Sequence, residues 1–251
     1  MPNQKRWMIS EFVLKSSKEF WASCIPHLSV DNVVFGFHDT QLKVLLLQTN
    51  AGKEWLLPGG YVRKDENIND AVKRVLKERT GADNIFLEQF ATFGDVNRSE
   101  AFFKEYSDDL WHKQRFISTS YYALVDYTRV APVNDGISSS CEWVNVEELP
   151  VLVMDHSLIL LRALEVLREQ LIYKPIGLNL LPEKFTLTEL QRLYEAILGV
   201  KLNRGNFYRK IMKYDILVKL NTTRSGGAHK SPDLYKFDEE KYNASLKSYS
   251  W

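Results

Sequence analysis

Residues 57–82, LPGGYVRKDENINDAVKRVLKERTGA, decide the fold of this 251-residue chain. The Pro-Gly-Gly turn at 58–60 follows an apolar run, which indicates a strand that ends in a loop. Asn69 is a suitable N-cap, apolar residues then recur with helical periodicity, and Gly81 is typical of a helix C-terminus. The stretch therefore predicts a strand, a loop and an amphipathic helix, in that order.

One face of the predicted helix has an unusual set of side chains. Val75 lies three residues before Glu78 and four before Arg79, so we expect all three side chains on one helical surface. An alkyl group and a guanidinium beside a single carboxylate make a poor site for Mg²⁺, which prefers oxygen ligands. Metal-assisted attack of water on a pyrophosphate needs such a metal.

The spacing of this stretch resembles the Nudix box, G-x5-E-x7-R-E-U-x-E-E-x-G-U, in which U is apolar. The residues that fall on the spacing are Gly60, Glu66, Arg74, Leu76, Glu78, Gly81 and Ala82. Val75 and Arg79 stand where the family has metal-binding glutamates. The resemblance implies an α/β/α sandwich with a mixed sheet, but we expect no catalytic residues and no cofactor. Glu66 and Glu78 are residual metal candidates, and Glu66 could instead pair with Arg74.

Composition is that of a soluble globular protein, with 45% hydrophobic and 26% charged residues. No apolar run approaches the ~20 residues of a membrane span, and the N-terminus lacks a signal-peptide pattern, so we expect a cytoplasmic protein without a membrane partner. Cys24 and Cys141 lack metal-ligand spacing, and we interpret them as buried thiols. Residues 174–251 hold 14 Lys and Arg against 8 Asp and Glu, which favours a polyanionic partner for this segment.

The order of the predicted elements indicates that the sandwich covers residues 28–171. We expect a short helix at 9–20 in a peripheral segment, strands at 28–37, 41–48, 85–92, 116–125 and 141–146, an irregular excursion at 97–114, and a helix at 155–171. The segment 174–184 contains two prolines and a glycine, so we place a domain boundary near Tyr173. This gives an N-terminal extension at 1–27, a Nudix-like domain at 28–173 and a second domain at 174–251.

The second domain has the pattern of a winged helix-turn-helix. Residues 186–189, TLTE, form a capping box at the start of a helix that Gly199 ends. Asn203 is the N-cap of a second, basic helix at 204–214. Short strands at 216–220 and 234–237 follow, around a loop rich in small and basic residues.

The basic helix is the candidate recognition helix for the major groove of DNA. Its charged face could also be merely solvated, but the charge bias, the capped first helix and the basic wing agree with DNA binding. Asn206 could contact a base edge, whereas the wing would mainly hold phosphates. The candidate DNA-binding residues are Thr188, Arg204, Asn206, Tyr208, Arg209, Lys210, Lys213, Arg224, His229 and Lys230.

A Nudix-like domain followed by this winged helix resembles the Nudix-related transcriptional regulators, the NrtR group and its AraR-type relatives, most strongly over residues 180–212. The resemblance implies a homodimeric, cytoplasmic repressor that binds palindromic operator DNA and senses ADP-ribose or a sugar such as L-arabinose. The implied effector site includes Gly60, Arg74, Glu78, Arg79, Arg98 and Arg115, with Gly59, Asp155 and His156 near it. Arg79 could clamp a phosphate or form an internal salt bridge. The segment 97–114, which follows the predicted strand at 85–92, departs from the family's pattern. A plain sugar therefore stays open as the effector.

Two other interpretations stay open at this point. The chain could be a Nudix pyrophosphatase of the ADP-ribose hydrolase type with an accessory domain, or a regulator with residual hydrolysis. Asp155 and His156 could equally form a helix cap or a local ion pair. The sequence does not distinguish a repressor from an activator and gives no operator sequence.

Overall fold

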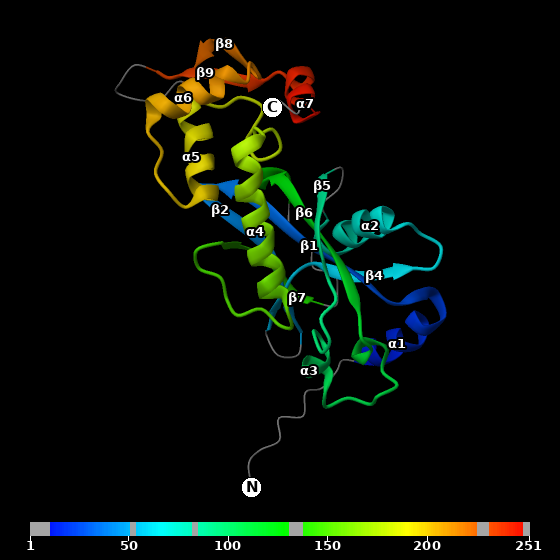
Figure 1. The fold of residues 1–251 in the computed structure, drawn as a ribbon. Coiled ribbons are helices and arrows are strands. Elements are labelled where there is room, and N and C mark those ends of the chain that lie inside the picture. Colours follow the sequence, from blue (N-terminus) through cyan, green and yellow to red (C-terminus); the bar gives the residue numbers. More distant parts are fainter. Residues whose placement is uncertain (1–10, 51–53, 82–84, 131–137, 225–230, 248–251) are drawn as a thin grey trace. The chain divides into compact units, whose positions relative to one another are not determined.

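The computed structural model describes residues 11–50, 54–81, 85–130, 138–224 and 231–247 (Figure 1). The chain packs as two compact units. The first contains Met1–Val34, Val44–Ala123 and Val130–Ala163, and the second contains Phe35–Lys43, Leu124–Arg129 and Leu164–Trp251. One of the boundaries between the units falls within a long helix, α4 (His156–Tyr173).

A seven-stranded sheet forms the centre of the Nudix-like part, in the order β3-β2-β1-β6-β5, with β4 paired to β1 and β7 paired to β2. The strands are β1 (Cys24–His38), β2 (Gln41–Thr49), β3 (Trp55–Leu56), β4 (Gly59–Arg63), β5 (Phe86–Phe93), β6 (Ile117–Asp126) and β7 (Ser138–Asn145). The antiparallel β1–β4 pair places Val30 opposite Gly60 and Asp31 opposite Gly59. Asp39 and Thr40, between β1 and β2, have positive φ angles of 48° and 68°, which is typical of a two-residue hairpin turn.

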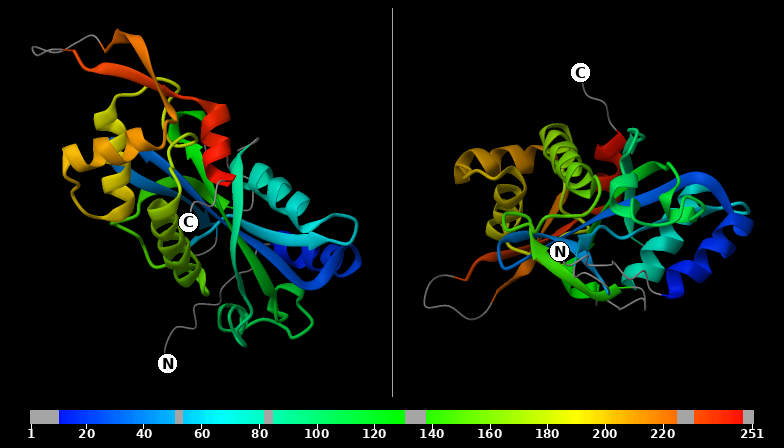
Figure 2. Two further views of the ribbon diagram at one scale, coloured as in Figure 1. Left: turned by 45° about the horizontal axis from the view of Figure 1, so that its top comes forward. Right: turned by 90° about the horizontal axis from the view of Figure 1, so that it is seen from below.

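Successive residues of β4 face opposite sides of the sheet, as the pleat requires. Val62 packs into a cluster with Ala71 and Val72 of α2 (Ile68–Thr80), whereas Tyr61 packs on the other side against Trp111 and Phe116. Figure 1 and Figure 2 accordingly show α2 and α1 (Glu11–Ser23) on opposite sides of β4. A ligand can therefore be assigned to one face of the sheet by the strand residues that it would contact.

The N-terminal helix is not peripheral, which corrects the prediction from the sequence. Ser17 is buried in α1, and its Oγ accepts a hydrogen bond of 3.0 Å from the backbone N of Trp111. The ring of Phe20 lies 5.0 Å from that of Tyr61 in an edge-on contact. Apolar and aromatic residues of α1 therefore complete the core on that face.

Two further predictions need correction. The N-cap of α2 is Asn67 rather than Asn69, and its side chain makes no capping hydrogen bond, although Gly81 ends the helix as predicted with φ 72°. The excursion at 97–114 contains a short helix, α3 (Glu100–Phe103), and a 3-10 turn, η1 (Trp111–Lys113). Trp111 is fully buried, so this segment is packed structure and not a loose excursion.

The second unit contains α5 (Leu187–Leu198), α6 (Arg204–Lys213), the antiparallel pair β8 (Leu217–Thr223) and β9 (Asp233–Phe237), and α7 (Glu239–Lys247). The capping box is confirmed, because Thr186 Oγ1 accepts from Glu189 N at 3.2 Å and Thr186 N donates to Glu189 Oε2 at 2.7 Å. Gly199 ends α5 with φ 71°. The helix-turn-helix and its wing have the predicted order, and α7 is an element that was not predicted.

The core of this unit is built from the apolar faces of α5, α6 and β9. Its buried side chains include Leu190, Leu193, Ile197, Phe207, Ile211 and Phe237. Tyr242 of α7 packs its ring 5.2 Å from that of Phe237, which ties the last helix to the wing strand. None of the described helices is long and apolar enough to cross a lipid bilayer.

Candidate effector site and nucleic-acid interface

The three helix residues singled out by the sequence do not share an open surface. Val75 is buried in the cluster with Val30 and Val62, and a Cβ at Gly60 would lie only 2.8 Å from its Cγ2. Glu78, in contrast, has a half-exposed side chain. Position 75 therefore belongs to the core of this protein, and only Glu78 and Arg79 border the candidate site.

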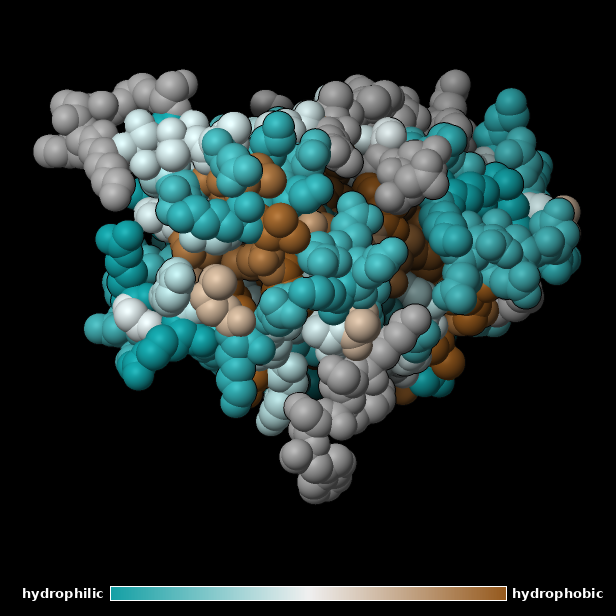
Figure 3. All heavy atoms as spheres, turned by 90° about the horizontal axis from the view of Figure 1, so that it is seen from above, coloured by the Kyte–Doolittle hydropathy of each residue, from teal (hydrophilic) through white to brown (hydrophobic). Residues whose placement is uncertain are grey.

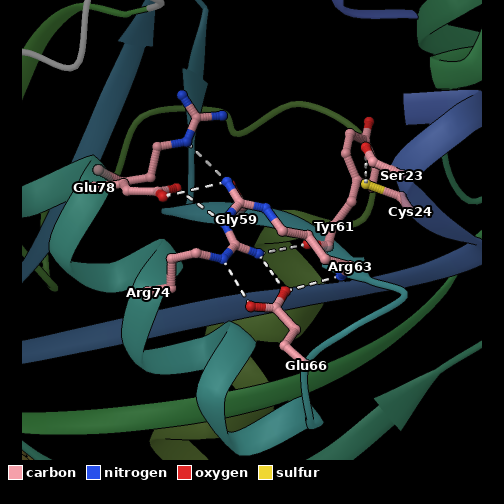
Figure 4. Close-up of polar contacts among 9 residues, drawn as sticks. Ser23, Cys24, Gly59, Tyr61, Arg63, Glu66, Arg74 and Glu78 are labelled. Carbon is pink, nitrogen blue, oxygen red and sulfur yellow. Dashed lines mark hydrogen bonds and ion pairs between the residues drawn. The ribbon is translucent and has the colours of Figure 1, made fainter. Parts of the chain in front are cut away.

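Arg74 holds the two carboxylates of this surface (Figure 4). It donates from Nε and Nη2 to Glu66 at 2.9 and 2.6 Å, and from Nη1 to Glu78 at 2.9 Å. The Glu66 carboxylate also accepts from the backbone N of Arg63 at 2.8 Å, and Glu78 lies 3.6 Å from Nη2 of Arg63. The hydrogen bonds from Arg74 hold the pKa of Glu66 below its ordinary value, and those to Glu66 raise the pKa of Arg74. The predicted Glu66–Arg74 pair is confirmed.

Arg79 adds a cation to the same surface and contacts the loop before β4. Its Nε donates to the carbonyl oxygen of Gly59 at 3.1 Å. Burial, with a smaller contribution from the charge of Arg79, lowers the pKa of His112 to about 4. Arg79 therefore connects α2 to the first residue of β4, and its charge acts on His112.

The residues of this surface do not fit a magnesium ion. Both carboxylates are held by arginines, position 75 offers no oxygen, and Arg79 does not deprotonate. Among the described residues, no group of three or more His, Cys, Asp or Glu is placed to hold a metal. Arg63, Arg74 and Arg79 instead outnumber Glu66 and Glu78, which favours an anion.

An aromatic cluster lies on the α1 side of β4 and includes His112, whose pKa the charge of Arg79 helps to lower. The ring of Tyr61 lies 4.8 Å from Phe116, 5.6 Å from His112 and 6.0 Å from Trp111. The Trp111 Nε1 and His112 Nδ1 atoms are buried and have no hydrogen-bond partner in the described part of the chain. The surroundings of Arg79 thus combine positive charge with flat rings.

Arg98 and Arg115, both predicted to contact the effector, have partners other than the residues around Arg74. The Arg98 side chain is only 5% exposed and donates to Asp155 at 2.7 and 2.8 Å and to Asp31 at 3.2 Å. Burial disfavours its charge, but the two aspartates more than offset this and raise the pKa of Arg98. Arg115 is exposed and donates to the carbonyl oxygen of Gly94 at 2.9 Å. These contacts favour a structural role for Arg98 and do not join Arg115 to the surface around Arg74.

Asp31 is the residue of this region that sequence reasoning missed. It is buried, and its Oδ2 accepts from Ser118 Oγ at 2.6 Å. His156, also buried, lies 3.7 Å from Asp31 and accepts from the backbone N of Leu57 through Nδ1 at 3.0 Å. The sequence contained one indication, since an acidic residue interrupts the apolar strand SVDNVVF. Asp155 and His156 are thus held by contacts with residues far away in the sequence, rather than by the helix cap or local ion pair of the alternative interpretation.

The candidate DNA-binding face of α6 is exposed and positively charged. Phe207 and Ile211 point into the core, and the exposed residues of the helix include Arg204, Asn206, Tyr208, Arg209, Lys210 and Lys213. Asn203 caps the helix by accepting from Asn206 N at 3.0 Å, as predicted, and Arg209 donates to the Asn206 side chain at 2.5 Å. Figure 3, which views the molecule from above relative to Figure 1, shows hydrophilic residues over much of this face with hydrophobic residues between them.

The wing residues predicted to bind DNA differ in their placement. Thr188 is exposed in the first turn of α5. The Arg224 guanidinium forms an ion pair with Glu189 and donates to the carbonyl oxygen of Lys184 at 3.4 Å, so it ties the end of β8 to the capping box. This contact favours a positioning role for Arg224. His229 and Lys230 lie outside the described residues.

Comparison with known proteins gives the family. A model of the NUDIX domain matches residues 25–163, which is more than half of the chain. The chain belongs to the Nudix family. A model of the NrtR DNA-binding winged helix domain matches residues 177–237. The predicted fold, a Nudix domain followed by a winged helix domain, is confirmed.

The relatives share both domains. A protein of Acinetobacter baylyi named ADPR responsive transcriptional repressor NtrR is 29% identical over 225 residues, which cover 87% of this chain and 84% of the relative. The crystal structure of Shewanella oneidensis NrtR complexed with a 27mer DNA has a TM-score of 0.70 and 28% identity, over 86% of this chain and 95% of that one. A MutT/nudix family protein of Enterococcus faecalis, with a TM-score of 0.66 and 22% identity over 94% and 95%, shows the same fold.

The Nudix domain also has a cleft of about 520 Å³ on the α2 side of the sheet. Its lining residues are Leu28, Val62, Glu66, Asn67, Ile68, Asn69, Gln89 and Tyr121. The Tyr121 hydroxyl donates to Asn69 Oδ1 at 3.0 Å, and the charge of Glu66 is already held by Arg74. The cleft therefore offers a neutral lining, and the cationic surface around Arg74 and Arg79 is the better match for an anionic effector.

Proposed function

We propose that this protein is a DNA-binding transcriptional repressor whose Nudix domain binds ADP-ribose and does not hydrolyse it. The observation that carries this proposal is the loss of two carboxylates from the metal-binding surface, where Val75 is buried in the core and Arg79 adds a cation. Arg74 donates hydrogen bonds to both Glu66 and Glu78, and Arg79 donates one to the carbonyl oxygen of Gly59. The donor set gives no support to the alternative function, a metal-dependent pyrophosphatase.

The exposed basic face of α6 supports the DNA-binding part of the proposal. A recognition helix needs a stable inner face and side chains free to reach the groove, and α6 has both. The matching relatives are named as a repressor and as a complex with DNA. A repressor of this kind binds a palindromic operator as a homodimer, because a two-fold axis in the DNA matches one in the protein.

The surroundings of Arg79 favour ADP-ribose over a plain sugar such as L-arabinose. Arg63, Arg74 and Arg79 together exceed Glu66 and Glu78 by one positive charge, which attracts a pyrophosphate, and arginine has suitable donor geometry for phosphate oxygens. The partly buried rings of Tyr61 and Phe20, which pack on the buried Trp111, offer stacking surface for a base. L-arabinose has neither charge nor an aromatic ring, so it would use none of these features.

The test uses purified full-length protein and duplex DNA from upstream of its own gene. We expect a mobility shift that weakens steeply between about 50 and 200 mM salt, as phosphate contacts require. ADP-ribose should release the DNA and L-arabinose should not. A scrambled duplex of equal length is the control for specificity, and lack of salt-sensitive binding to the upstream duplex would contradict the proposal.

A parallel assay addresses hydrolysis. ADP-ribose is incubated with the protein, Mg²⁺ and a phosphatase, and phosphate release is measured. Turnover at about 1 per second or faster is typical of an enzyme and would favour the pyrophosphatase. We expect no release above that of a protein-free control.

A further inference from the structure

The loop that begins β4 is held from two sides. On one side Arg79 donates to the Gly59 carbonyl oxygen at 3.1 Å. On the other side Asp31 packs so closely that a Cβ at Gly59 would clash with its Oδ1. The neighbouring Pro58 carbonyl accepts from the backbone N of Asn32 at 2.9 Å and from its side-chain Nδ2 at 3.1 Å. A displacement of Gly59 is therefore transmitted to β1 at Asp31.

Asp31 is connected in turn to the start of α4. Arg98 bridges Asp31 and Asp155, with distances of 3.2 Å to the first and 2.7 Å to the second. His156, the first residue of α4, accepts from Leu57 N in the same loop as Gly59. The two aspartates share one guanidinium deep in the domain, and a packed ion cluster of this kind changes between discrete arrangements rather than by gradual deformation.

The far end of α4 belongs to the second unit and is bonded to the winged helix domain. Within that unit, Arg168 Nε donates to the carbonyl oxygen of Ile197 in the last turn of α5 at 2.8 Å. Just beyond α4, Ile176 N donates to the buried Tyr194 hydroxyl on α5 at 3.0 Å. A single helix therefore starts at the ion cluster and ends at the first helix of the helix-turn-helix.

We propose that Asp31, Arg98 and Asp155 are positioning residues that transmit effector binding from Gly59 to α4 and so to the winged helix domain. This inference rests on the proposed function and describes how effector binding regulates DNA binding. An anionic effector at Arg79 competes with the Gly59 carbonyl for the guanidinium, which loosens the loop. The loop shift changes the contact between Gly59 and Asp31, and Arg98 then redistributes between Asp31 and Asp155 at the first turn of α4. In this proposal the effector and the DNA both act on α4, and coupling between two sites requires such a shared element.

The experiment measures coupling separately from binding. For each variant, the Kd for upstream DNA is determined with and without saturating ADP-ribose, and the Kd for ADP-ribose is determined without DNA. Coupling is the ratio of the two DNA Kd values, and in the wild type we expect about 5-fold to 150-fold. In Arg98→Lys and Asp155→Asn the ratio should fall to about 2 or less. The Kd for DNA without ADP-ribose and the Kd for ADP-ribose without DNA should each stay within about 3-fold of the wild type, since neither residue contacts a ligand.

A matched control separates transmission from stability. Tyr122→Phe removes the hydrogen bond of 2.9 Å from Tyr122 to Glu88 within the same Nudix domain, which involves none of Asp31, Arg98 and Asp155, and it should keep the wild-type ratio. Ser118→Ala removes the hydroxyl that donates to Asp31 while keeping every charge, so it tests the cluster even where a charge variant fails to fold. It should lower the ratio at least about 2-fold.

The outcomes distinguish this inference from the proposed function. If the wild type does not change its DNA affinity with ADP-ribose, the proposed function fails. If the wild type responds and the Ser118→Ala, Arg98→Lys and Asp155→Asn variants that fold keep the full ratio, the proposed function stands and the transmission route is overturned. An equal loss of coupling in Tyr122→Phe would likewise overturn it, because the effect would then reflect general destabilisation.

Discussion

Arg74 and Glu66 form a bidentate pair, with Nε–Oε2 and Nη2–Oε1 distances of 2.9 and 2.6 Å. The pair closes the loop between β4 and α2, because Glu66 also accepts from the backbone N of Arg63. Two residues on the Nudix spacing thus shape the loop in this protein without a metal between them.

The pair gives the stability of the Nudix domain a defined pH dependence. The hydrogen bonds from Arg74 lower the pKa of Glu66 in the folded state, so its contribution to stability is present above pH 4.5 and is lost as the pH falls through the lowered value. Glu66→Gln should therefore lower the free energy of unfolding by about 1–2 kcal/mol at pH 7, and the difference from the wild type should shrink below pH 4. Urea unfolding at both pH values measures this. Glu105→Gln, at an exposed site, should show neither effect, and an unchanged difference at low pH would contradict the assignment.

Restoring the family's glutamate at position 75 should fail. Val75 is buried beneath Gly60, so Val75→Glu would bring an unpaired carboxylate into the core and cost about 2–4 kcal/mol of stability. Val75→Thr has nearly the same volume and should cost about 1–2 kcal/mol. Denaturant unfolding checks both values, and a stable Val75→Glu variant with Mg²⁺-dependent hydrolysis would show that position 75 is still part of a metal site.

Gly59 should tolerate no side chain. A Cβ there meets the Asp31 carboxylate, which is itself fixed by Ser118 and Arg98, so Gly59→Ala should weaken ADP-ribose binding at least about 10-fold. Gly205→Ala in α6 is the matched control, since its Cβ would have its nearest neighbour at 3.5 Å. That change should leave ADP-ribose binding unaltered and stabilise the helix by up to about 1 kcal/mol. Titration calorimetry and thermal unfolding give the two readouts.

The basic face of α6 should account for most of the salt dependence of DNA binding. Lys210→Ala should weaken binding to all sequences alike and reduce the slope of log K against log salt by about 1. Fluorescence anisotropy with a labelled duplex at several salt concentrations measures the slope. Lys18→Ala removes an exposed charge from α1 and should leave it unchanged. If the two variants behave alike, α6 is not the DNA-binding surface.

The features predictable from the sequence were those that depend on near neighbours. Thr186 and Glu189 lie three residues apart, and Gly81 and Gly199 end their helices through their own backbone conformations, so local chemistry determines these caps. The Glu66–Arg74 pair also follows from a spacing of eight residues.

The parts that escaped prediction depend on residues far apart in the chain. Arg98 forms hydrogen bonds with Asp31 and Asp155, which lie 67 and 57 residues away in the sequence, and no periodic pattern predicts such contacts. Val75 has the right helical spacing for the ligand face, but the rotation of α2 against β4 turns it into the core. The side-chain roles of Arg98 and Val75 are therefore set by tertiary packing rather than by the motif.

The central claim is that the arginine-rich surface binds ADP-ribose without metal and without turnover. Isothermal titration of ADP-ribose into the full-length protein, once with Mg²⁺ and once with EDTA, tests this most directly. We predict the same Kd in both buffers and intact ADP-ribose afterwards. An affinity that collapses in EDTA, or a nucleotide cleaved in the presence of Mg²⁺, would contradict the account.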